Sequence, residues 1–546
     1  MSTIPTKAEK CKGSMLGTAI GDALGWPNEP RSKNRTKKPK IIDQFVEWTR
    51  SSNKPRWHDE KILPGEYSDD TQLTLCIARS IIAGDWEKFF VGQELPFWLQ
   101  YERGGGNAML KAAKSYKNGC PIWQSQYTRD YFSAGGNGAI MRILPHVIAS
   151  AQTFNITKLM IDVIRDTLIT HGHPRAFLGA TCYAYALDYL LRKDTILAYG
   201  ELVTAVINGQ NDWGAFLDAN IFRDWLVIAQ QYCAYDFRAE WESTLARMLR
   251  HLELVKISLE KGGILDDAKI LTDLECFGHA SGAGDVAALV AIYLASRYAN
   301  NPTLGVKIAA FSFGADTDTI ASITGGLLGM LSGTDWIPAE WRLVQDYDAL
   351  IQITELLLAD NKKEATKKEV TEAKTQNNQW CASPIGKIRF IESKSVPNGK
   401  HGTVIIKKWK TTLGQTLYTK VFQPQEIPLR PKLIKNPLPM NQPISLYNTI
   451  DSKTHTHDSL NLLIQSQESK IKQQDVTLPI GSRQFIIDLT AIEDLLNNSK
   501  FKTNMTIGKI LKIIRDVIKN QESYEDIAKR FHVELSVIEQ IGKYVR

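Results

Sequence analysis

The sequence predicts a chain of three parts: an all-α N-terminal domain, a small β-rich module and a C-terminal helical module. Over the first 360 residues, apolar residues recur at spacings of three and four, as on one face of a helix, and alternating strand patterns are scarce. After a polar stretch, the pattern changes to short segments of β-branched and aromatic residues, and it becomes helical again near the end of the chain. The expected parts are residues 1–360, 379–445 and 480–546.

The helical pattern of the N-terminal part is divided into segments by polar, glycine-rich stretches. Residues 71–83, for example, place Leu73, Ile77 and Ile81 near one face. Further segments of this kind are 159–169, 176–191, 286–298, 319–331 and 343–358. We expect glycine-rich turns to join these helices.

A change of composition follows the N-terminal part. Residues 361–378 contain almost no apolar side chains, which indicates a linker or the solvated end of a helix. Beyond them, residues 386–391, 402–409 and 415–422 are short, β-branched or aromatic, and separated by turn residues. This pattern predicts a small antiparallel sheet.

The end of the chain has a helical pattern and a basic charge. Residues 523–541 resemble a helix-turn-helix, although His532 stands in the turn where glycine is usual, and a helical hairpin that binds protein is the alternative. Residues 361–546 hold 30 Lys and Arg against 18 Asp and Glu, whereas residues 1–360 hold 36 against 41. The basic excess favours a nucleic-acid or protein partner for residues 379–546, with a solvated basic surface as the alternative.

Composition places the chain among globular proteins, with 43% hydrophobic and 23% charged residues. The seven cysteines are scattered and include no Cys-x-x-Cys pair, so we expect neither a disulfide framework nor a zinc site. The N-terminus has no apolar signal-like segment, and no apolar run reaches transmembrane length. We therefore expect a cytoplasmic protein without membrane contact.

Two acidic clusters far apart in the chain are the segments best suited to hold a metal. Residues 67–71 read Tyr-Ser-Asp-Asp-Thr, and residues 314–319 read Gly-Ala-Asp-Thr-Asp-Thr. Magnesium and manganese prefer hard oxygen ligands, and these carboxylates and hydroxyls could hold two such ions if folding brings the clusters together. The alternative is that both clusters cap helices, although a cap needs only one such residue.

Further motifs accompany the clusters in a fixed order. They are the glycine-rich residues 13–25 with Glu29 just beyond, then 104–107, 135–142, 170–174 and 325–329. In this order, anchored by the two acidic clusters, the motifs resemble the ADP-ribosylglycohydrolase family, which includes the dinitrogenase-reductase-activating glycohydrolases. The resemblance covers roughly residues 10 to 360.

The resemblance implies an all-α fold with two divalent cations, Mg²⁺ or alternatively Mn²⁺, at its centre. The implied metal ligands are Ser68, Asp69, Asp70, Asp316, Asp318 and Thr319. Asp70 and Asp318 are the candidates for orienting the attacking water, although an aspartate that binds metal cannot also be a free base. Glu29 either gates the site or assists proton transfer. A loop glutamate near Arg31 and Lys33 is the alternative interpretation.

Glycine-rich loops and one histidine are the expected substrate contacts. Glycine lets backbone N–H groups approach a phosphate, which suits a diphosphate or ribose. The residues concerned are Gly104, Gly105, Gly106, Gly136, Asn137, Gly138 and His171. For the histidine, a structural hydrogen bond is the alternative interpretation.

The resemblance implies a hydrolase that cleaves the glycosidic bond of an ADP-ribosyl group on a modified protein, nucleic acid or small acceptor. Two alternatives are open: a hydrolase of free ADP-ribose derivatives, and an ADP-ribose sensor whose C-terminal region contacts nucleic acid or protein. The intact acidic clusters argue against the sensor. Because every implied ligand lies before residue 360, we expect residues 361–546 to be separable from catalysis.

Overall fold

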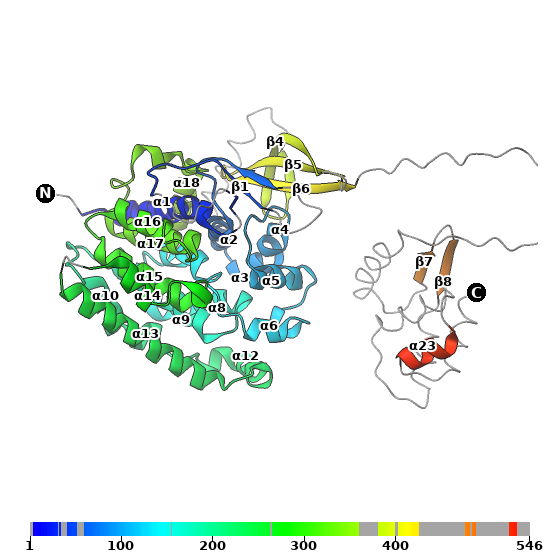
Figure 1. Cartoon of the computed structure of the whole chain (residues 1–546), viewed down its shortest axis with the longest axis horizontal. Helices are drawn as coiled ribbons and strands as arrows, with labels where there is room; N and C mark the ends of the chain where they lie inside the picture. The colour runs from blue at the N-terminus through cyan, green and yellow to red at the C-terminus, as the bar shows by residue number, and fades with distance from the viewer. Residues whose placement is uncertain are drawn as a thin grey trace, which may run out of the picture. The chain divides into compact units, whose positions relative to one another are not determined.

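The computed structural model describes residues 4–30, 32–33, 41–51, 59–153, 155–262, 265–359, 380–398, 402–424, 476–480, 483–487 and 523–531. The chain divides into two compact units, residues 1–429 and residues 430–546. The first unit contains a helical body and a small sheet (Figure 1).

The first unit is mainly helical, as the sequence predicts. Its α-helices are α1 (Lys7–Gly25), α2 (Asp69–Ala83), α3 (Trp86–Phe89), α4 (Leu95–Trp98), α5 (Asn107–Lys117), α6 (Thr128–Phe132), α7 (Leu144–Ala149), α8 (Ile156–Thr170), α9 (Pro174–Arg192), α10 (Glu201–Asn208), α11 (Gln210–Trp213), α12 (Ala219–Tyr232), α13 (Phe237–Glu260), α14 (Asp267–Asp273), α15 (Gly284–Arg297), α16 (Pro302–Ala310), α17 (Thr317–Ser332) and α18 (Tyr347–Leu358). Each of the six helical segments singled out in the sequence lies mostly within one of these helices, namely α2, α8, α9, α15, α17 and α18.

Helices α1 and α17 lie against each other, and glycines make the contact. A Cβ atom built on Gly17 would lie 2.2 Å from the carbonyl oxygen of Gly325, and one built on Gly325 would lie 2.1 Å from that of Gly17. Gly21 meets the backbone of α17 in the same way. Residues 13–25 and 325–329 thus lie inside helices α1 and α17, where their glycines leave out side chains at a helix crossing.

The antiparallel direction of the two helices brings the end of α1 to the start of α17. Gly25 approaches Thr317, whose hydroxyl donates a hydrogen bond of 2.9 Å to the Gly25 carbonyl oxygen. The chain then continues from α1 to Glu29, which lies beside Asp316 and Asp318. The helix crossing thus brings an acidic residue from the beginning of the chain to the second acidic cluster.

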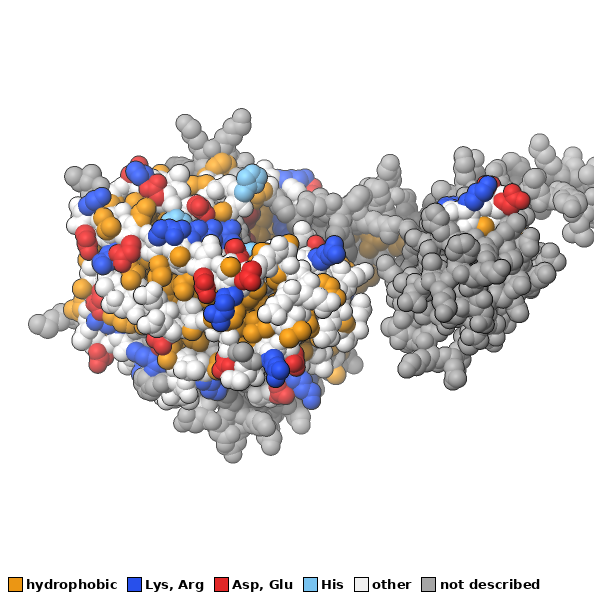
Figure 2. Space-filling model, turned by 90° about the horizontal axis from the view of Figure 1, so that it is seen from below, with side chains coloured by type: hydrophobic (Ala, Val, Ile, Leu, Met, Phe, Trp, Pro, Cys, Tyr) orange, Lys and Arg blue, Asp and Glu red, His pale blue; other side chains and the backbone are white. Residues whose placement is uncertain are grey.

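The core of the first unit lies where α9, α15 and α17 pack together with α1. Leu187, Ile292 and Leu327 are fully buried there. On the face of this unit seen in Figure 2, acidic and basic side chains are interspersed among apolar ones. Among the described helices, none combines the length and apolar character needed to cross a bilayer. The cytoplasmic location stays a prediction.

Two antiparallel sheets complete the first unit (Figure 1). Their strands are β1 (Trp48–Arg50) and β2 (Glu60–Ile62) in one sheet, and β3 (Trp380–Ser383), β4 (Gly386–Pro397), β5 (Gly402–Thr411) and β6 (Thr416–Pro424) in the other. The four-stranded sheet, ordered β3-β4-β5-β6, confirms the predicted small sheet. The first pair was not predicted, because strands of three residues are too short to show an alternating pattern.

The second unit is described at three short segments. Strands β7 (Val476–Ile480) and β8 (Arg483–Ile487) pair in antiparallel fashion, and helix α23 spans Tyr524–Phe531. The expectation that residues 480–546 form a helical module is wrong for residues 483–487, which form strand β8. Helix α23 coincides with the first helix of the predicted helix-turn-helix, whose second helix lies outside the described residues, as does the linker 361–378. The helix-turn-helix and its nucleic-acid or protein partner stay predictions.

We predict that Gly17→Ala destabilises the first unit, because the added methyl group would overlap the Gly325 carbonyl oxygen. Overpacking of this kind costs about 1–3 kcal/mol of unfolding free energy, measurable by urea denaturation. Gly92→Ala is the matched control, since nothing lies within 4 Å of a Cβ built on exposed Gly92. Equal stability of the two variants would contradict a direct backbone contact between α1 and α17.

Candidate active site

The two acidic clusters, separated by roughly 250 residues, meet at one cavity of about 460 Å³. Of the residues singled out in the sequence, the following line this cavity: Glu29, Asp69, Asp70, Gly104, Gly106, Gly136, Asn137, Gly138, His171, Asp316, Asp318 and Thr319. Ser68 is fully buried behind the cavity wall, and Gly105 packs against Trp98. The clusters and the glycine-rich loops therefore belong to a single site.

The first cluster forms the start of helix α2. Ser68 is the N-cap residue, and its Oγ accepts a hydrogen bond of 3.2 Å from the backbone N–H of Asp70. Asp22 of α1 accepts hydrogen bonds from the backbone N–H of Ser68 at 3.0 Å and from the Thr71 hydroxyl at 2.6 Å. The backbone N–H of Thr71 donates to the same carboxylate at 3.0 Å. Asp22 thus fixes the turn that presents Asp69 and Asp70 to the cavity.

The second cluster forms the start of helix α17. Glu29 Oε1 accepts hydrogen bonds from the backbone N–H of Thr317 at 2.8 Å and from its hydroxyl at 3.0 Å. Asp316 Oδ2 accepts one of 2.9 Å from the side-chain amide of Asn137. One ligand oxygen each of Glu29, Asp316 and Asp318 lies within 4.8 Å of the others. Glu29 therefore belongs to the acidic cluster.

The acidic residues repel one another in a buried place. Burial raises the pKa of Asp70 well above its usual range, and the charges of Asp22, Asp69 and Asp316 raise it further. The pKa of Asp318 is raised well above its usual range in the same way, by burial and then by Glu29, Asp316 and Asp70.

The same residues fit a hard divalent cation. Among the buried side-chain atoms that the structure describes, Asp70 Oδ2 has no hydrogen-bond partner. The cluster of Glu29, Asp316 and Asp318 offers only carboxylate oxygen atoms as metal ligands. Such hard oxygen ligands are the ones that Mg²⁺ and Mn²⁺ prefer. A cation would offset the repulsion that burial makes costly.

His171 lines the cavity beside Gly136 and Gly138 as a neutral ring. Thr170 Oγ1 accepts a hydrogen bond of 2.9 Å from Arg142, so its own hydrogen is free to donate to His171 Nδ1, 2.7 Å away. The direction of this bond follows the tautomer of the ring. Burial and then the charge of Arg142 lower the pKa of His171 to about 3. The ring is therefore neutral at pH 7.

The two glycine-rich loops differ from simple phosphate cradles, because their backbone N–H groups are partly used. The N–H of Asn137 donates to the Gly282 carbonyl oxygen at 3.0 Å. The N–H groups of Gly104 and Gly105 donate to Glu102 Oε2 at 3.2 and 3.3 Å. Gly104, with a φ of 127°, instead lets the backbone approach Asp69, since a Cβ there would lie 2.4 Å from Asp69 Oδ1.

Helix α5 begins at the cavity without a capping side chain. Its N-cap is Gly106, and Asn107 and Ala108, its first two residues, line the cavity. The first N–H groups of a helix have no partners within the helix, and its N-terminus carries partial positive charge. This end of α5 therefore suits an anionic group of a bound molecule.

Comparison with known proteins agrees with this site. A family model described as ADP-ribosylglycohydrolase matches residues 3–367. The chain belongs to the ADP-ribosylglycohydrolase family. It is thereby a hydrolase of glycosidic bonds of ADP-ribose, and the family generally uses divalent metal ions.

This ADP-ribosylglycohydrolase is similar in sequence to several known proteins. The Escherichia coli protein YegU is 24% identical over 358 residues, which are 64% of this chain and 94% of that protein. The ADP-ribosyl-[dinitrogen reductase] glycohydrolase of Rhodospirillum rubrum is 29% identical over 214 residues, 39% of this chain and 68% of that protein. The ADP-ribosylarginine hydrolase Tri1 of Serratia proteamaculans is 26% identical over 194 residues, 34% of this chain and 48% of that protein.

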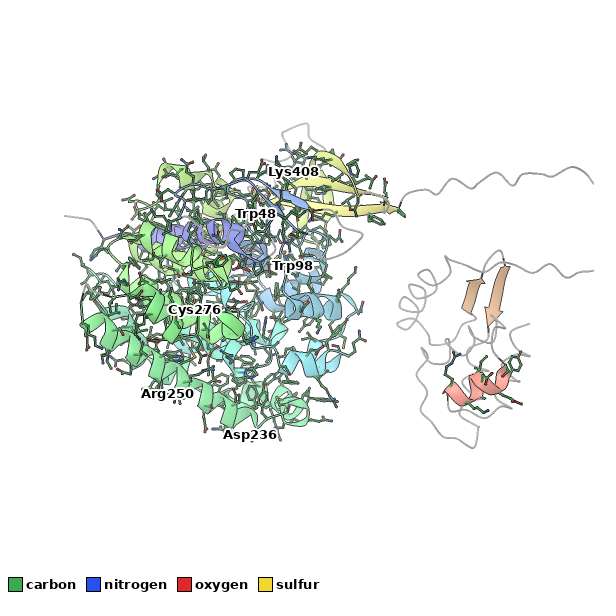
Figure 3. All side chains as sticks on the ribbon, viewed as in Figure 1. Trp48, Trp98, Asp236, Arg250, Cys276 and Lys408 are labelled. Carbon is green, nitrogen blue, oxygen red and sulfur yellow. The ribbon has the colours of Figure 1, made fainter. Side chains whose placement is uncertain are left out.

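Some residues that the sequence did not suggest also line the cavity of this ADP-ribosylglycohydrolase. Trp26 and Trp48 meet edge to face, with ring centroids 5.1 Å apart, and both line the cavity together with Arg50. Trp48 is labelled in Figure 3. Trp48 and Arg50 belong to strand β1, outside any motif, so no sequence signal marked them. Asp22 did stand in the first glycine-rich motif.

The neutral state of His171 gives the stability a defined pH dependence. In the unfolded chain, a histidine binds a proton below about pH 6.5. In the fold, His171 does so only near pH 3. The stability that its neutral form provides is present above pH 6.5 and is lost as the pH falls, by about 1.4 kcal/mol per pH unit.

We predict that the difference in unfolding free energy between the wild type and His171→Asn becomes smaller between pH 7 and pH 5. The variant lacks the group that must be protonated, so only the wild type loses this contribution. Urea denaturation of both proteins at each pH measures the difference. A difference that does not change with pH would contradict a buried, neutral His171.

Proposed function

We propose that this chain is a metal-dependent hydrolase that cleaves the bond between ADP-ribose and an acceptor on a modified protein, with two Mg²⁺ ions at the acidic clusters. The observation that carries the proposal is the meeting of both clusters at one cavity. Proposed ligands are Asp69, Asp70, Asp316, Asp318 and Thr319, with Glu29 beside them, and Ser68 stays a predicted ligand. The oxygen donors suit Mn²⁺ as an alternative.

The acidic residues would orient water at the sugar carbon that carries the acceptor. When bound, the cations supply positive charge that offsets the carboxylates and polarises nearby oxygen atoms. Asp70 and Asp318 remain the candidates for orienting the attacking water. Glu29 is a third, because Thr317 holds one of its oxygens. A carboxylate oxygen that does not bind a cation would also favour the oxocarbenium character expected at the ribose carbon.

The part of the cavity beside His171 and the start of α5 would hold the diphosphate. The uncapped start of α5 provides backbone N–H groups, and the neutral ring of His171 lines the same cavity. Gly136 and Gly138 leave room beside the His171 ring, since a Cβ on Gly138 would lie 2.9 Å from its Cε1. In this arrangement the distal ribose lies between the diphosphate and the acidic clusters.

The names of two relatives favour a modified protein as the substrate, and one of the names specifies arginine. One is an ADP-ribosylarginine hydrolase, and another acts on ADP-ribosylated dinitrogen reductase. We therefore propose a guanidinium group of a modified protein as the acceptor. Hydrolysis of free ADP-ribose derivatives and simple sensing of ADP-ribose are the alternatives that the experiments below distinguish.

We predict that Asp318→Ala abolishes turnover and weakens Mg²⁺ binding, because it removes a carboxylate from the centre of the cluster. Isothermal titration calorimetry measures binding, and circular dichroism shows whether the helical fold remains. Asp335→Ala is the matched control, since Asp335 is exposed shortly after the end of the same helix, α17. Treatment of the wild type with EDTA should remove activity, and Mg²⁺ should restore it. Full activity after EDTA treatment would contradict the metal requirement.

We predict that the wild type with Mg²⁺ releases ADP-ribose faster from an arginine-linked substrate than from serine-linked or nucleobase-linked substrates. The assay measures free ADP-ribose by chromatography, with Asp318→Ala as the inactive control. Faster turnover of another linkage would overturn the acceptor assignment. Binding of ADP-ribose without turnover of any linkage would instead favour the sensor.

A further inference from the structure

The four-stranded sheet, β3–β6 (residues 380–398 and 402–424), packs on the part of the helical body that carries the first acidic cluster (Figure 1). Ile388 and Leu417 of the sheet share a buried cluster with Leu73 and Ile77 of α2. Helix α2 begins with Asp69 and Asp70 at the cavity. The sheet thus supports the helix that presents these two carboxylates.

A buried network of charged side chains joins strand β6 to the helical body. Lys420 Nζ donates a hydrogen bond of 2.7 Å to Glu60 Oε2, and the Tyr418 hydroxyl donates one of 2.7 Å to Glu66 Oε1. Arg103 bridges the same two glutamates, with 3.0 Å from its Nε to Glu60 and 2.8 Å from a terminal nitrogen to Glu66. Its guanidinium carbon also lies 4.7 Å from the centre of the Tyr418 ring.

The network is buried, so its charges depend on one another. Glu60 and Glu66 are each 7% exposed, and Arg103 is 2% exposed. Burial alone would raise the pKa of Glu60, but Arg103, Lys420 and Arg50 together lower it to about 2. Without Lys420, Glu60 would lose its 2.7 Å hydrogen bond to the sheet and keep Arg103 and Arg50 as partners, so the two arginines would have to share this buried carboxylate differently. Lys420 is therefore the direct ion pair from the sheet to Glu60, which also holds Arg103 in place.

Arg103 connects this network to the first acidic cluster. The next residue is Gly104, whose backbone lies so close to Asp69 that a Cβ there would be 2.4 Å from Asp69 Oδ1. The backbone N–H of Arg103 also donates to the side-chain carbonyl of Gln72 on α2. Glu60 in turn lies 3.7 Å from Arg50, which lines the cavity. A shift of Arg103 would therefore move the wall of the cavity beside Asp69.

A second connection reaches the same cluster from its other side. Asp346, whose side chain is 1% exposed, accepts hydrogen bonds from Lys410 Nζ at 2.8 Å and from the Thr416 hydroxyl at 2.6 Å. The Tyr67 hydroxyl donates to the same carboxylate at 2.8 Å. Tyr67 directly precedes Ser68, the N-cap of α2. Strands β5 and β6 thus contact both the residue before the N-cap of α2 and, through Glu60 and Glu66, the loop at Arg103 and Gly104.

We propose that the four-stranded sheet is part of the catalytic body and that Lys420 and Tyr418 are positioning residues, which act through Glu60, Glu66 and Arg103. They hold the Arg103–Gly104 backbone against Asp69 and so set the geometry of the first acidic cluster. The proposal rests on the proposed function. It reverses the expectation from the sequence that everything after residue 360 is separable from catalysis, at least for residues 380–424.

The test uses the full chain with single substitutions. Lys420→Met removes the charge from the network, and Tyr418→Phe removes one oxygen atom while it keeps the ring. We expect each to weaken Mn²⁺ or Mg²⁺ binding and to lower kcat by about 10-fold, as loss of a group that orients a metal ligand commonly does. KM for the substrate should change little, because the proposed diphosphate contacts lie elsewhere. Lys420→Arg, which retains the charge, should recover most of both.

The control is Lys394→Met, which changes an exposed lysine on strand β4 of the same sheet. It should bind metal and turn over substrate like the wild type. If Lys420→Met does not fold, the metal affinity and kcat of Tyr418→Phe still test the inference. If folded Tyr418→Phe and Lys420→Met match the wild type in metal affinity and in kcat, the inference is wrong. A wild type that binds metal but releases no ADP-ribose would overturn the proposed function, whereas the metal affinities of the variants would still test the sheet.

Discussion

The direct backbone contact between helices α1 and α17 is the constraint on which the rest of the structure depends. Glycines on both helices bring the chains so close that a Cβ on Gly17 would lie 2.2 Å from a carbonyl oxygen. Because the helices run antiparallel, the end of α1 reaches the start of α17, and Glu29 joins Asp316 and Asp318. The same α1 carries Asp22, which fixes the first turn of α2. One helix thus organises both acidic clusters.

The clusters need this rigid support because buried carboxylates repel one another. Neutral donors hold some of these carboxylates in place. Asn137 holds Asp316, and Thr317 holds Glu29. Asp70 keeps one buried oxygen without a partner. Such an arrangement is costly by itself, and the cations that we propose would offset the repulsion.

The four-stranded sheet also contacts the helical body through buried charged groups that fixed partners hold. Its contacts with the body include buried ion pairs and hydrogen bonds at Glu60, Glu66 and Asp346, as well as apolar packing. Polar groups of this kind are costly to bury unless their partners stay in place. The sheet and the helices therefore stabilise each other, and the segment between them in the chain does not separate them in the fold.

The sequence by itself determined the helical class, the small sheet and the identity of the acidic clusters, because helical spacing, β-branched segments and motif order are local features. Only the tertiary structure decided what depends on distant contacts. It showed the glycines of residues 13–25 to be a helix interface, gave Glu29 its partner Thr317 and brought Arg50 to the cavity. It also joined Lys420 to Glu60 across 360 residues. No local pattern encodes such pairs, since each residue alone resembles an ordinary surface charge or a flexible glycine until the fold buries it against its partner.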